Sequence, residues 1–377
     1  MKTFGIGIIG FGFMGRLHAY SVANLPFYYE PMPFRAELRG ICSRSDESLA
    51  RAQEMFAFPY ATRDYRELLA RDDIDAVSIC TPNADHEAMA LAAIAARKHV
   101  YLEKPVSTDA ASARRIALAA DEAGVACQTV FNYRFYPSTL RAKQWIDEGN
   151  LGRILSFRAL YLHSGSVQAD KPVGWRLQKD AAGGGVMADL GSHALDLLTW
   201  LCGDVRRVVS AQTSLYPQRP LSGGGMTGDL TEDVSVALIT LENGALGTLE
   251  SSKAATGIVD ELRMEIHGDK GALRFNLQEP DWLEVFDETR PEQPLGGLRG
   301  WHKLQCLQRY EAPGGKTMVK QSIGWNRSHV HSYFSFLDAI NGGRLPSPSL
   351  ADGARIQEIM EAAYRSAERG TWEDARG

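Results

Sequence analysis

Short apolar runs alternate with helical patterns over roughly the first 130 residues of the chain. The runs lack regularly spaced polar positions, which is typical of strands buried on both faces of a parallel sheet. They predict strands at residues 5–9, 36–42, 74–80, 99–102 and 125–131, and the stretches between them predict helices at 16–23, 47–55, 65–71, 84–97 and 108–123. This alternation predicts an α/β fold whose first domain, residues 1–131, is a doubly wound parallel sheet of the Rossmann type.

The pattern changes from residue 132 onward. It predicts helices at 138–148, 184–202, 328–340 and 351–369, and strands at 153–163, 207–216, 234–241, 245–252, 262–268, 272–276 and 283–287. Asn243-Gly244 lies between two of these strands and is a strong signal for a tight hairpin. We therefore expect residues 132–377 to form an α+β domain with an open, mainly antiparallel sheet. Two stretches, 25–34 with three prolines and 288–325, predict irregular loops.

A glycine-rich turn follows the first predicted strand. Gly10, Gly12 and Gly15 form G-x-G-x-x-G where a strand passes into a helix. In such a turn the first glycine permits the bend, the second admits a pyrophosphate, and the third lets the helix pack on the strand. The free N–H groups of the helix start then bind the anion. A structural glycine turn is the alternative, but the flanking strand and helix favour a dinucleotide site.

The end of the second strand bears on which dinucleotide binds. An Asp or Glu there accepts the ribose 2′-hydroxyl of NAD, whereas an Arg accommodates the 2′-phosphate of NADP. This chain has Ser43-Arg44 at that position, which favours NADP over NAD. Two alternatives stay open, because Arg44 can be merely solvated and Asp46 can turn back toward a ribose.

Length, charge and cysteine content narrow the class of protein. A chain of 377 residues exceeds the size of one hydrophobic core, so two domains are expected. The net charge of −5 gives no basic field, so we expect no nucleic acid partner. No run of about 20 apolar residues predicts a membrane span. The five cysteines are widely spaced, which favours reduced thiols in a cytoplasmic protein and no metal site.

Two further patterns carry candidate chemistry. The helix predicted at 184–202 places Asp189, His193, Asp196 and Trp200 on one face, because they are spaced i, i+4, i+7 and i+11. A solvated helix face would give the same stripe. Lys104, however, lies just past the carboxyl end of a predicted parallel strand, where open α/β sheets bind their ligands.

These motifs together resemble the glucose-fructose oxidoreductase/inositol dehydrogenase (Gfo/Idh/MocA) family. The resemblance rests on the glycine turn, Thr81-Pro82-Asn83, Glu103-Lys104-Pro105 and Asp189-x-Gly191-x-His193, and it covers nearly the whole chain. It implies that Lys104 binds the reacting hydroxyl, that His193 is the acid/base and that Asp189 positions the substrate. Trp175-Arg176 and Gly183-Gly184-Gly185 resemble the substrate loop of the sugar-oxidising members.

The chemistry of alcohol oxidation supports these roles. The nicotinamide takes the hydride, and the protein supplies orientation and a base. An imidazole has its ordinary pKa near neutral pH, which suits His193 to accept the hydroxyl proton. Lys104 would place positive charge where alkoxide character develops.

We therefore expect an NADP- or NAD-dependent dehydrogenase of a sugar, cyclitol or sugar derivative, assembled as a homodimer or homotetramer. An enzyme that retains its nucleotide for redox-assisted glycoside cleavage or internal oxidation-reduction, and a non-catalytic nucleotide-sensing regulator, are the alternatives. The residues expected to contact the cofactor are Gly10, Gly12, Phe13, Met14, Gly15, Ser43, Arg44, Thr81, Pro82, Asn83, His86, Glu103 and Lys104. Those expected to contact substrate are Lys104, Asn132, Arg134, Trp175, Arg176, Asp189 and His193.

Overall fold

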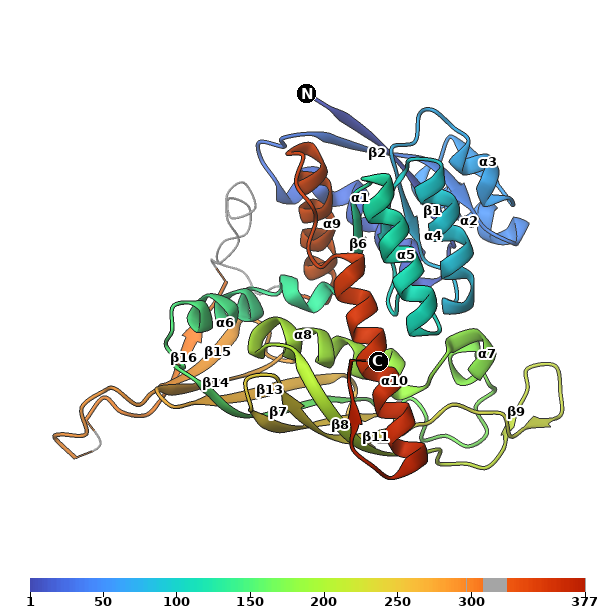
Figure 1. Cartoon of the computed structure of the whole chain (residues 1–377). Coiled ribbons are helices and arrows are strands. Elements are labelled where there is room, and N and C mark those ends of the chain that lie inside the picture. Colours follow the sequence, from blue (N-terminus) through green and yellow to red (C-terminus); the bar gives the residue numbers. More distant parts are fainter. Residues whose placement is uncertain (296, 308–323, 377) are drawn as a thin grey trace. The chain divides into compact units, whose positions relative to one another are not determined.

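The computed structural model describes residues 1–295, 297–307 and 324–376 as two compact units (Figure 1). The first unit contains residues 1–135 and 324–355. The second contains the described residues of 136–307 and residues 356–376. The predicted boundary after residue 131 left 324–355 in the second domain, whereas in the structure these residues pack with the first unit.

The first unit is a six-stranded parallel sheet in the order β3-β2-β1-β4-β5-β6. This is the strand order of a dinucleotide-binding Rossmann sheet and confirms the predicted fold. The strands are β1 Thr3–Ile9, β2 Arg35–Cys42, β3 Tyr60–Thr62, β4 Ala76–Ile79, β5 His99–Leu102 and β6 Cys127–Thr129. The helices are α1 Phe13–Tyr28, α2 Asp46–Phe56, α3 Tyr65–Leu69, η1 Asn83–Asp85, α4 His86–Ala95, α5 Ala110–Ala123, η2 Asn132–Phe135 and α9 Trp325–Asn341.

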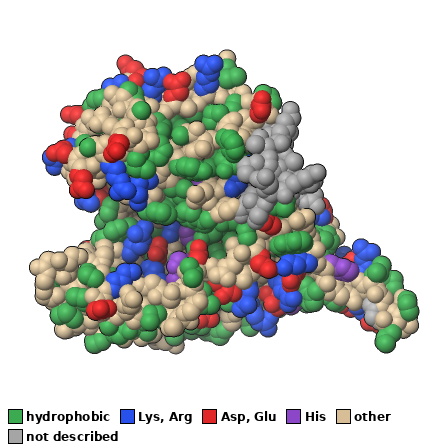
Figure 2. Space-filling view, turned by 180° about the vertical axis from the view of Figure 1, so that it is seen from behind, with side chains coloured by type: hydrophobic (Ala, Val, Ile, Leu, Met, Phe, Trp, Pro, Cys, Tyr) green, Lys and Arg blue, Asp and Glu red, His purple; other side chains and the backbone are tan. Residues whose placement is uncertain are grey.

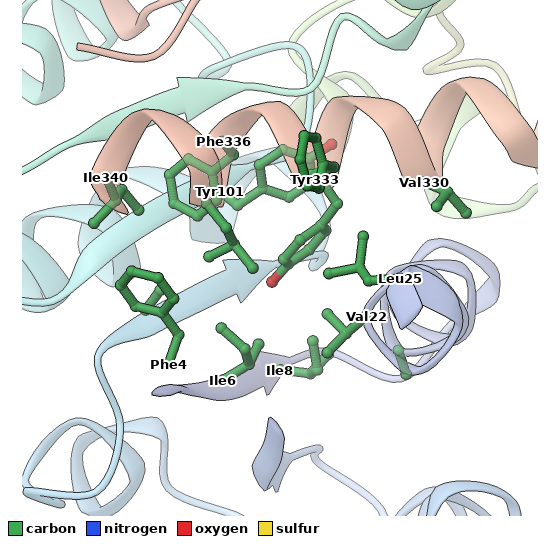
Figure 3. Packing of buried hydrophobic residues seen from close by; sticks show 14 of the residues in the cluster. Phe4, Ile6, Ile8, Val22, Leu25, Tyr101, Val330, Tyr333, Phe336 and Ile340 are labelled. Atoms are coloured by element: carbon green, nitrogen blue, oxygen red, sulfur yellow. The ribbon is translucent and has the colours of Figure 1, made fainter. Parts of the chain in front are cut away.

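Each face of this sheet has its own hydrophobic core. One core joins the sheet to α1, α2 and α9, and the other joins it to α3, α4 and α5. Figure 3 shows the first of these cores, with Val330, Tyr333 and Ile340 of α9 over the strands. Their spacing places them on one face of the helix. The burial of this face explains why α9 belongs to the first unit although it follows more than 300 residues later in the chain.

Helix α1 continues into the stretch that we predicted to be a loop. Pro26 lies inside the helix, which ends at Tyr28. Proline has no N–H to donate, so the helix gives up the hydrogen bond that residue 26 would otherwise make to the carbonyl oxygen of Val22. Leu25 and Tyr29 on either side are almost fully buried in the core against α9. Tertiary burial therefore overrides the local signal of the three prolines.

The second unit is built on a nine-stranded sheet in the order β16-β15-β14-β13-β7-β12-β11-β8-β17. All neighbours are antiparallel except β7 and β12, which confirms the mainly antiparallel prediction. The strands are β7 Ile154–Leu162, β8 Val205–Thr213, β11 Val234–Leu241, β12 Leu246–Ser252, β13 Glu261–Gly268, β14 Gly271–Asn276, β15 Trp282–Asp287, β16 Trp301–Gln305 and β17 Glu373–Asp374, with a separate ribbon of β9 Arg219–Pro220 and β10 Met226–Thr227. The helices are α6 Pro137–Asp147, η3 Trp175–Leu177, α7 Lys179–Ala182, the π-helix η4 Met187–Gly191 and α8 Ser192–Cys202. Helix α10 Leu350–Arg369 begins in the first unit, and its residues from 356 onward belong to the second.

The helices α6, α8 and α10 lie on one side of the second sheet (Figure 1). The stretch 288–325, predicted to be irregular, contains β16, which extends the sheet beside β15. Residues 296 and 308–323 of that stretch lie outside the described residues. None of the described helices is long and apolar enough to cross a membrane.

Candidate active site

The glycine turn of the first unit has the shape that a dinucleotide requires. Gly10 has φ +93°, and a Cβ there would come within 2.8 Å of the Cys80 carbonyl oxygen. A Cβ on Gly15 would collide with the carbonyl oxygen of Gly10, whereas a Cβ on Gly12 would meet no atom within 4 Å. The three positions therefore match a tight bend, close helix packing and an open approach for a phosphate group.

The start of α1 fits an anion as well. Gly12 is the N-cap of the helix and gives it no side-chain acceptor. Phe13 is 64% exposed and stacks on Trp325 of α9, with ring centroids 5.8 Å apart. Met14 is half-buried. The N–H groups of this first turn are of the kind that bind a pyrophosphate.

A chain of hydrogen bonds holds the backbone of Lys104. The Nε2 atom of His18 lies 3.0 Å from Oε1 of Glu103, and its Nδ1 atom lies 3.2 Å from the Sγ atom of Cys80. The other Glu103 oxygen accepts the Lys104 amide at 3.2 Å. Burial opposes ionisation of Glu103, but the hydrogen bond from His18 and the nearby charges, Lys104 included, leave its pKa below the ordinary value. A buried carboxylate thus fixes the strand end that presents Lys104.

His329 of α9 is a buried imidazole close to this network. Its ring packs against Trp325 at 4.4 Å and lies 6.5 Å from the ring of His18. Neither ring nitrogen has a hydrogen-bond partner among the described residues, although the side chain is 2% exposed. Burial lowers the pKa of His329 to about 3. A neutral imidazole offers one donor and one acceptor, and leaving both unused costs free energy unless a ligand or water uses them.

These observations test whether a nicotinamide dinucleotide fits the first unit. The open space at Gly12, the uncapped start of α1 and the two unused nitrogens of His329 are features that such a ligand would use. The residues present therefore fit the cofactor.

Other residues expected near the cofactor have defined places. Thr81 and Pro82 are half-buried beyond the end of β4, and the buried Asn83 opens η1. His86 is fully buried, and its ring nitrogens face the carbonyl oxygens of Thr81 and Pro105 at 3.1 and 3.0 Å. We expected His86 to contact the cofactor; in the structure its ring links the two motif loops.

The end of β2 carries the residues expected to select the dinucleotide. The Ser43 amide donates to the carbonyl oxygen of Thr62, and Arg44 is exposed. Ser45 is the N-cap of α2. Asp46 lies 3.7 Å from Arg63 and belongs to the first turn of that helix.

Two residues predicted to bind substrate join segments of the first unit. Asn132 donates to the hydroxyl of Ser328 at 3.0 Å, which ties η2 to α9. Arg134 is buried, and its guanidinium lies 3.8 Å from a carboxylate oxygen of Asp352. Both contacts support a structural role for these residues, and their contact with substrate stays a prediction.

The second unit collects charged side chains around Asp189. One carboxylate oxygen of Asp189 lies 2.8 Å from Nζ of Lys253, and the other lies 3.6 Å from Nε of Arg176. The guanidinium of Arg176 also stacks on the ring of Trp175 at 4.4 Å. The structure therefore joins three of the predicted substrate residues. It adds Lys253, which sequence reasoning missed although it directly follows the end of β12.

His193 lies near the start of α8 and is 7% exposed. Its ring packs edge-on against Tyr161 of β7, with centroids 6.0 Å apart. Asp196, one turn further, is 1% exposed. The alternative of a solvated helix face is therefore wrong for these two side chains. The π-helical turn at 187–191 just before them is a feature that occurs often at functional sites.

On the face shown in Figure 2, acidic and basic side chains are interspersed. Within the described ranges, no three His, Cys, Asp or Glu side chains are grouped as a metal ion would require. Lys104 belongs to the first unit, and Asp189 and His193 belong to the second.

Comparison with known proteins covers both units. Residues 4–131 match the family model described as the NAD-binding Rossmann fold of the oxidoreductase family, and residues 143–374 match the C-terminal alpha/beta domain of the same family (GFO_IDH_MocA).

Individual relatives align over nearly their full length. Levoglucosan dehydrogenase of Pseudarthrobacter phenanthrenivorans is 31% identical over 99% of this chain and 98% of its own. Inositol 2-dehydrogenase of Rhizobium meliloti is 26% identical, over 97% of each chain. A structure of levoglucosan dehydrogenase in complex with NADH and levoglucosan aligns with a TM-score of 0.94 at 32% identity, covering all of both chains.

Proposed function

The chain belongs to the Gfo/Idh/MocA family of oxidoreductases, and from that premise we propose that it is an NAD(P)-dependent dehydrogenase that oxidises a hydroxyl-bearing carbon of a sugar, a cyclitol or a sugar derivative. The observation that carries the proposal is the group formed by Asp189, Lys253 and Arg176, one helical turn before the buried His193. A fold alone does not define an activity, so the proposal is argued from these side chains.

The cofactor would lie on the glycine turn of the first unit. When bound, the nicotinamide supplies the hydride acceptor. The first-turn amides of α1 would hold the pyrophosphate, Phe13 and Trp325 would border it, and a nitrogen of His329 would hydrogen-bond a polar group of the dinucleotide. These roles follow from open space and unused hydrogen-bonding groups on the described side chains.

The protein groups handle the proton. In the proposed reaction His193 accepts the proton of the substrate hydroxyl, and Lys104 stabilises the negative charge that develops on that oxygen. The Glu103–His18–Cys80 chain keeps the backbone of Lys104 in place. Asp189 would accept a hydrogen bond from a substrate hydroxyl while Lys253 keeps its carboxylate oriented.

The substrate class follows from the relatives and from the site. Two relatives are named as dehydrogenases of levoglucosan and of inositol, and both compounds are neutral, hydroxyl-rich rings. A carboxylate flanked by two cationic side chains offers acceptors and donors for neighbouring hydroxyl groups. We therefore take levoglucosan and myo-inositol as the first compounds to test.

The preference for NADP over NAD is a further part of the proposal. Arg44 is exposed just past the end of β2, and Asp46 lies near Arg63 within the first turn of α2. Arg44 would pair with a 2′-phosphate. The levoglucosan dehydrogenase structure contains NADH, so both cofactors must be compared directly.

We also propose a homo-oligomer that covers the open sheet face. Leu155, Val236, Leu238 and Leu246 lie on neighbouring strands of the second sheet and are 42%, 45%, 44% and 51% exposed. Exposed apolar side chains on neighbouring strands support an interaction surface on this face. A second copy of the chain, packed through the same face, is the occupant we propose.

A substrate panel with absorbance at the nicotinamide band tests the function. Net reduction of NADP or NAD with a polyol supports the dehydrogenase. Turnover of a glycoside without net absorbance change would indicate a retained nucleotide. Tight dinucleotide binding without turnover of any polyol or glycoside would indicate a regulator and contradict the proposal.

A further inference from the structure

One residue outside the family motifs contacts the start of the helix that carries Asp189 and His193. The amide of Gly185 donates to Oε2 of Glu232 at 2.9 Å, and the amide of Met187 donates to Oε1 at 2.9 Å. Between them, the amide of Val186 donates to the backbone carbonyl oxygen of Glu232 at 3.0 Å. Three consecutive N–H groups at a helix start are thus satisfied by one residue, more than 40 positions away in the chain.

The glycines at this helix start are explained by the same contact. A Cβ on Gly185 would collide with the backbone oxygen of Glu232, and a Cβ on Gly184 would collide with the hydroxyl of Tyr364. That hydroxyl donates to Oε1 of Glu232 at 3.0 Å. The expectation that the three glycines at 183–185 belong to a substrate loop stays a prediction. Two of them provide the close approach of Glu232 and Tyr364.

Gly185 links Glu232 to Asp189. The amide of Asp189 donates to the carbonyl oxygen of Gly185 at 2.9 Å, so the residue held by Glu232 supports the backbone of Asp189. The π-helical turn 187–191 starts at Met187, whose amide Glu232 also holds. A π turn lacks the regular α register, and fixed amides at its start define where its side chains project.

The neighbours of Glu232 hold the partners of Asp189. The hydroxyl of Thr231 donates to the carbonyl oxygen of Arg176 at 3.2 Å. The carbonyl oxygen of Asp233 accepts the amide of Lys253 at 2.9 Å. Three successive residues therefore anchor the backbones of the three groups that form the charged cluster.

We propose that Glu232 is the positioning residue of the site: together with Thr231 and Asp233 it sets the geometry of Asp189, Arg176 and Lys253, and Tyr364 holds its carboxylate in place. Burial raises the pKa of the Glu232 carboxyl, while the hydrogen bonds from Met187, Tyr364 and Gly185 act in the opposite direction. The Glu232 side chain acts on Asp189 through the backbone of the helix start. The inference rests on the proposed function for its catalytic meaning, and its structural part can be tested separately.

The first measurement is amide hydrogen exchange over residues 185–189. Glu232→Gln keeps the shape but replaces one acceptor oxygen by an NH₂ donor, so one of the two helix amides loses its partner. We expect exchange of this segment to be about 10-fold faster or more in that variant. The control is Ser210→Ala, which removes a different buried hydrogen bond, to Ala363 of α10, and leaves the helix start intact.

The second measurement is a double-mutant cycle on kcat/KM with the polyol that the substrate panel identifies. If Glu232 acts through Asp189, the variant Asp189→Asn with Glu232→Gln should be within about 2-fold of Asp189→Asn alone. The affinity for NADH should stay within about 2-fold in Glu232→Gln, because the cofactor residues belong to the first unit. Ser210→Ala should retain the wild-type kcat/KM at a temperature where it is folded.

The outcomes separate the two proposals. Unchanged exchange at residues 185–189 in Glu232→Gln would overturn the positioning role, and so would losses in kcat/KM that multiply in the double variant. If the wild-type protein oxidises no polyol, the proposed function fails, and faster exchange in Glu232→Gln would still support the positioning of the helix.

Discussion

Replacement of His329 by phenylalanine should change how stability depends on pH. In the folded chain burial holds the pKa of His329 at about 3, against an ordinary value of 6.5. The unfolded chain therefore takes up a proton as the pH falls below about 6.5, while the folded chain does not. The contribution of neutral His329 to the free energy of unfolding is therefore fully present near pH 7. It is lost as the pH falls from about 6.5 to about 3.

The magnitude follows from the two pKa values. Lowering the pH from 7 to 5 should cost about 2 kcal/mol of unfolding free energy at this single residue, because each pKa unit corresponds to about 1.4 kcal/mol. Phenylalanine keeps an aromatic ring against Trp325 and does not titrate. The difference in unfolding free energy between pH 7 and pH 5 should therefore be smaller in His329→Phe by about 2 kcal/mol.

Urea unfolding followed by circular dichroism at both pH values measures this difference. His86 and His331 are also buried with lowered pKa values, so the variant should keep part of the acid sensitivity. The control is His302→Phe, because the side chain of His302 is exposed in the folded chain. If wild type and His329→Phe lost the same unfolding free energy between pH 7 and pH 5, His329 would not be the source of this pH dependence.

Three further predictions concern the site and the surface. Lys253→Met should lower kcat/KM for a polyol by about 10- to 100-fold, because it removes a charge-assisted hydrogen bond to Asp189. The control Lys303→Met breaks an ion pair with Glu279 on the surface and should leave kcat/KM unchanged. Equal effects of the two substitutions would contradict the role of Lys253. Arg44→Ala should weaken NADP binding about 10-fold in calorimetric titration and leave the affinity for NAD unchanged, with Arg63→Ala as the control. If wild type bound NAD more tightly than NADP, the proposed preference would be wrong. Leu238→Glu should lower the mass measured by light scattering, whereas Leu345→Glu, on an exposed loop, should not; a wild-type monomer would exclude the assembly.

The Rossmann unit was predictable because its signals are local. A buried strand followed by Gly10, Gly12 and Gly15 specifies a strand, a turn and a helix within 15 residues. The three-residue strand β3 has no such signal and was not predicted. Helix α9 was predicted as a helix, but its packing on the first sheet was not predicted, because the apolar face of a helix does not reveal which sheet it will cover.

The site was predictable only where its residues lie in one motif. Asp189 and His193 share a helix, so their spacing placed them together. Lys253, Glu232 and His329 come from distant segments, and a lysine after a strand or a glutamate before one has no distinctive local pattern. Their roles depend on strand pairing and helix packing, which set contacts between residues far apart in sequence.

The proposed mechanism depends above all on His193 as the acid/base. The decisive measurement compares wild type with His193→Ala in kcat on an established polyol and in affinity for the dinucleotide. We predict that kcat falls by about 10²- to 10⁴-fold while cofactor affinity stays nearly unchanged. Full activity in His193→Ala would contradict the proposed mechanism.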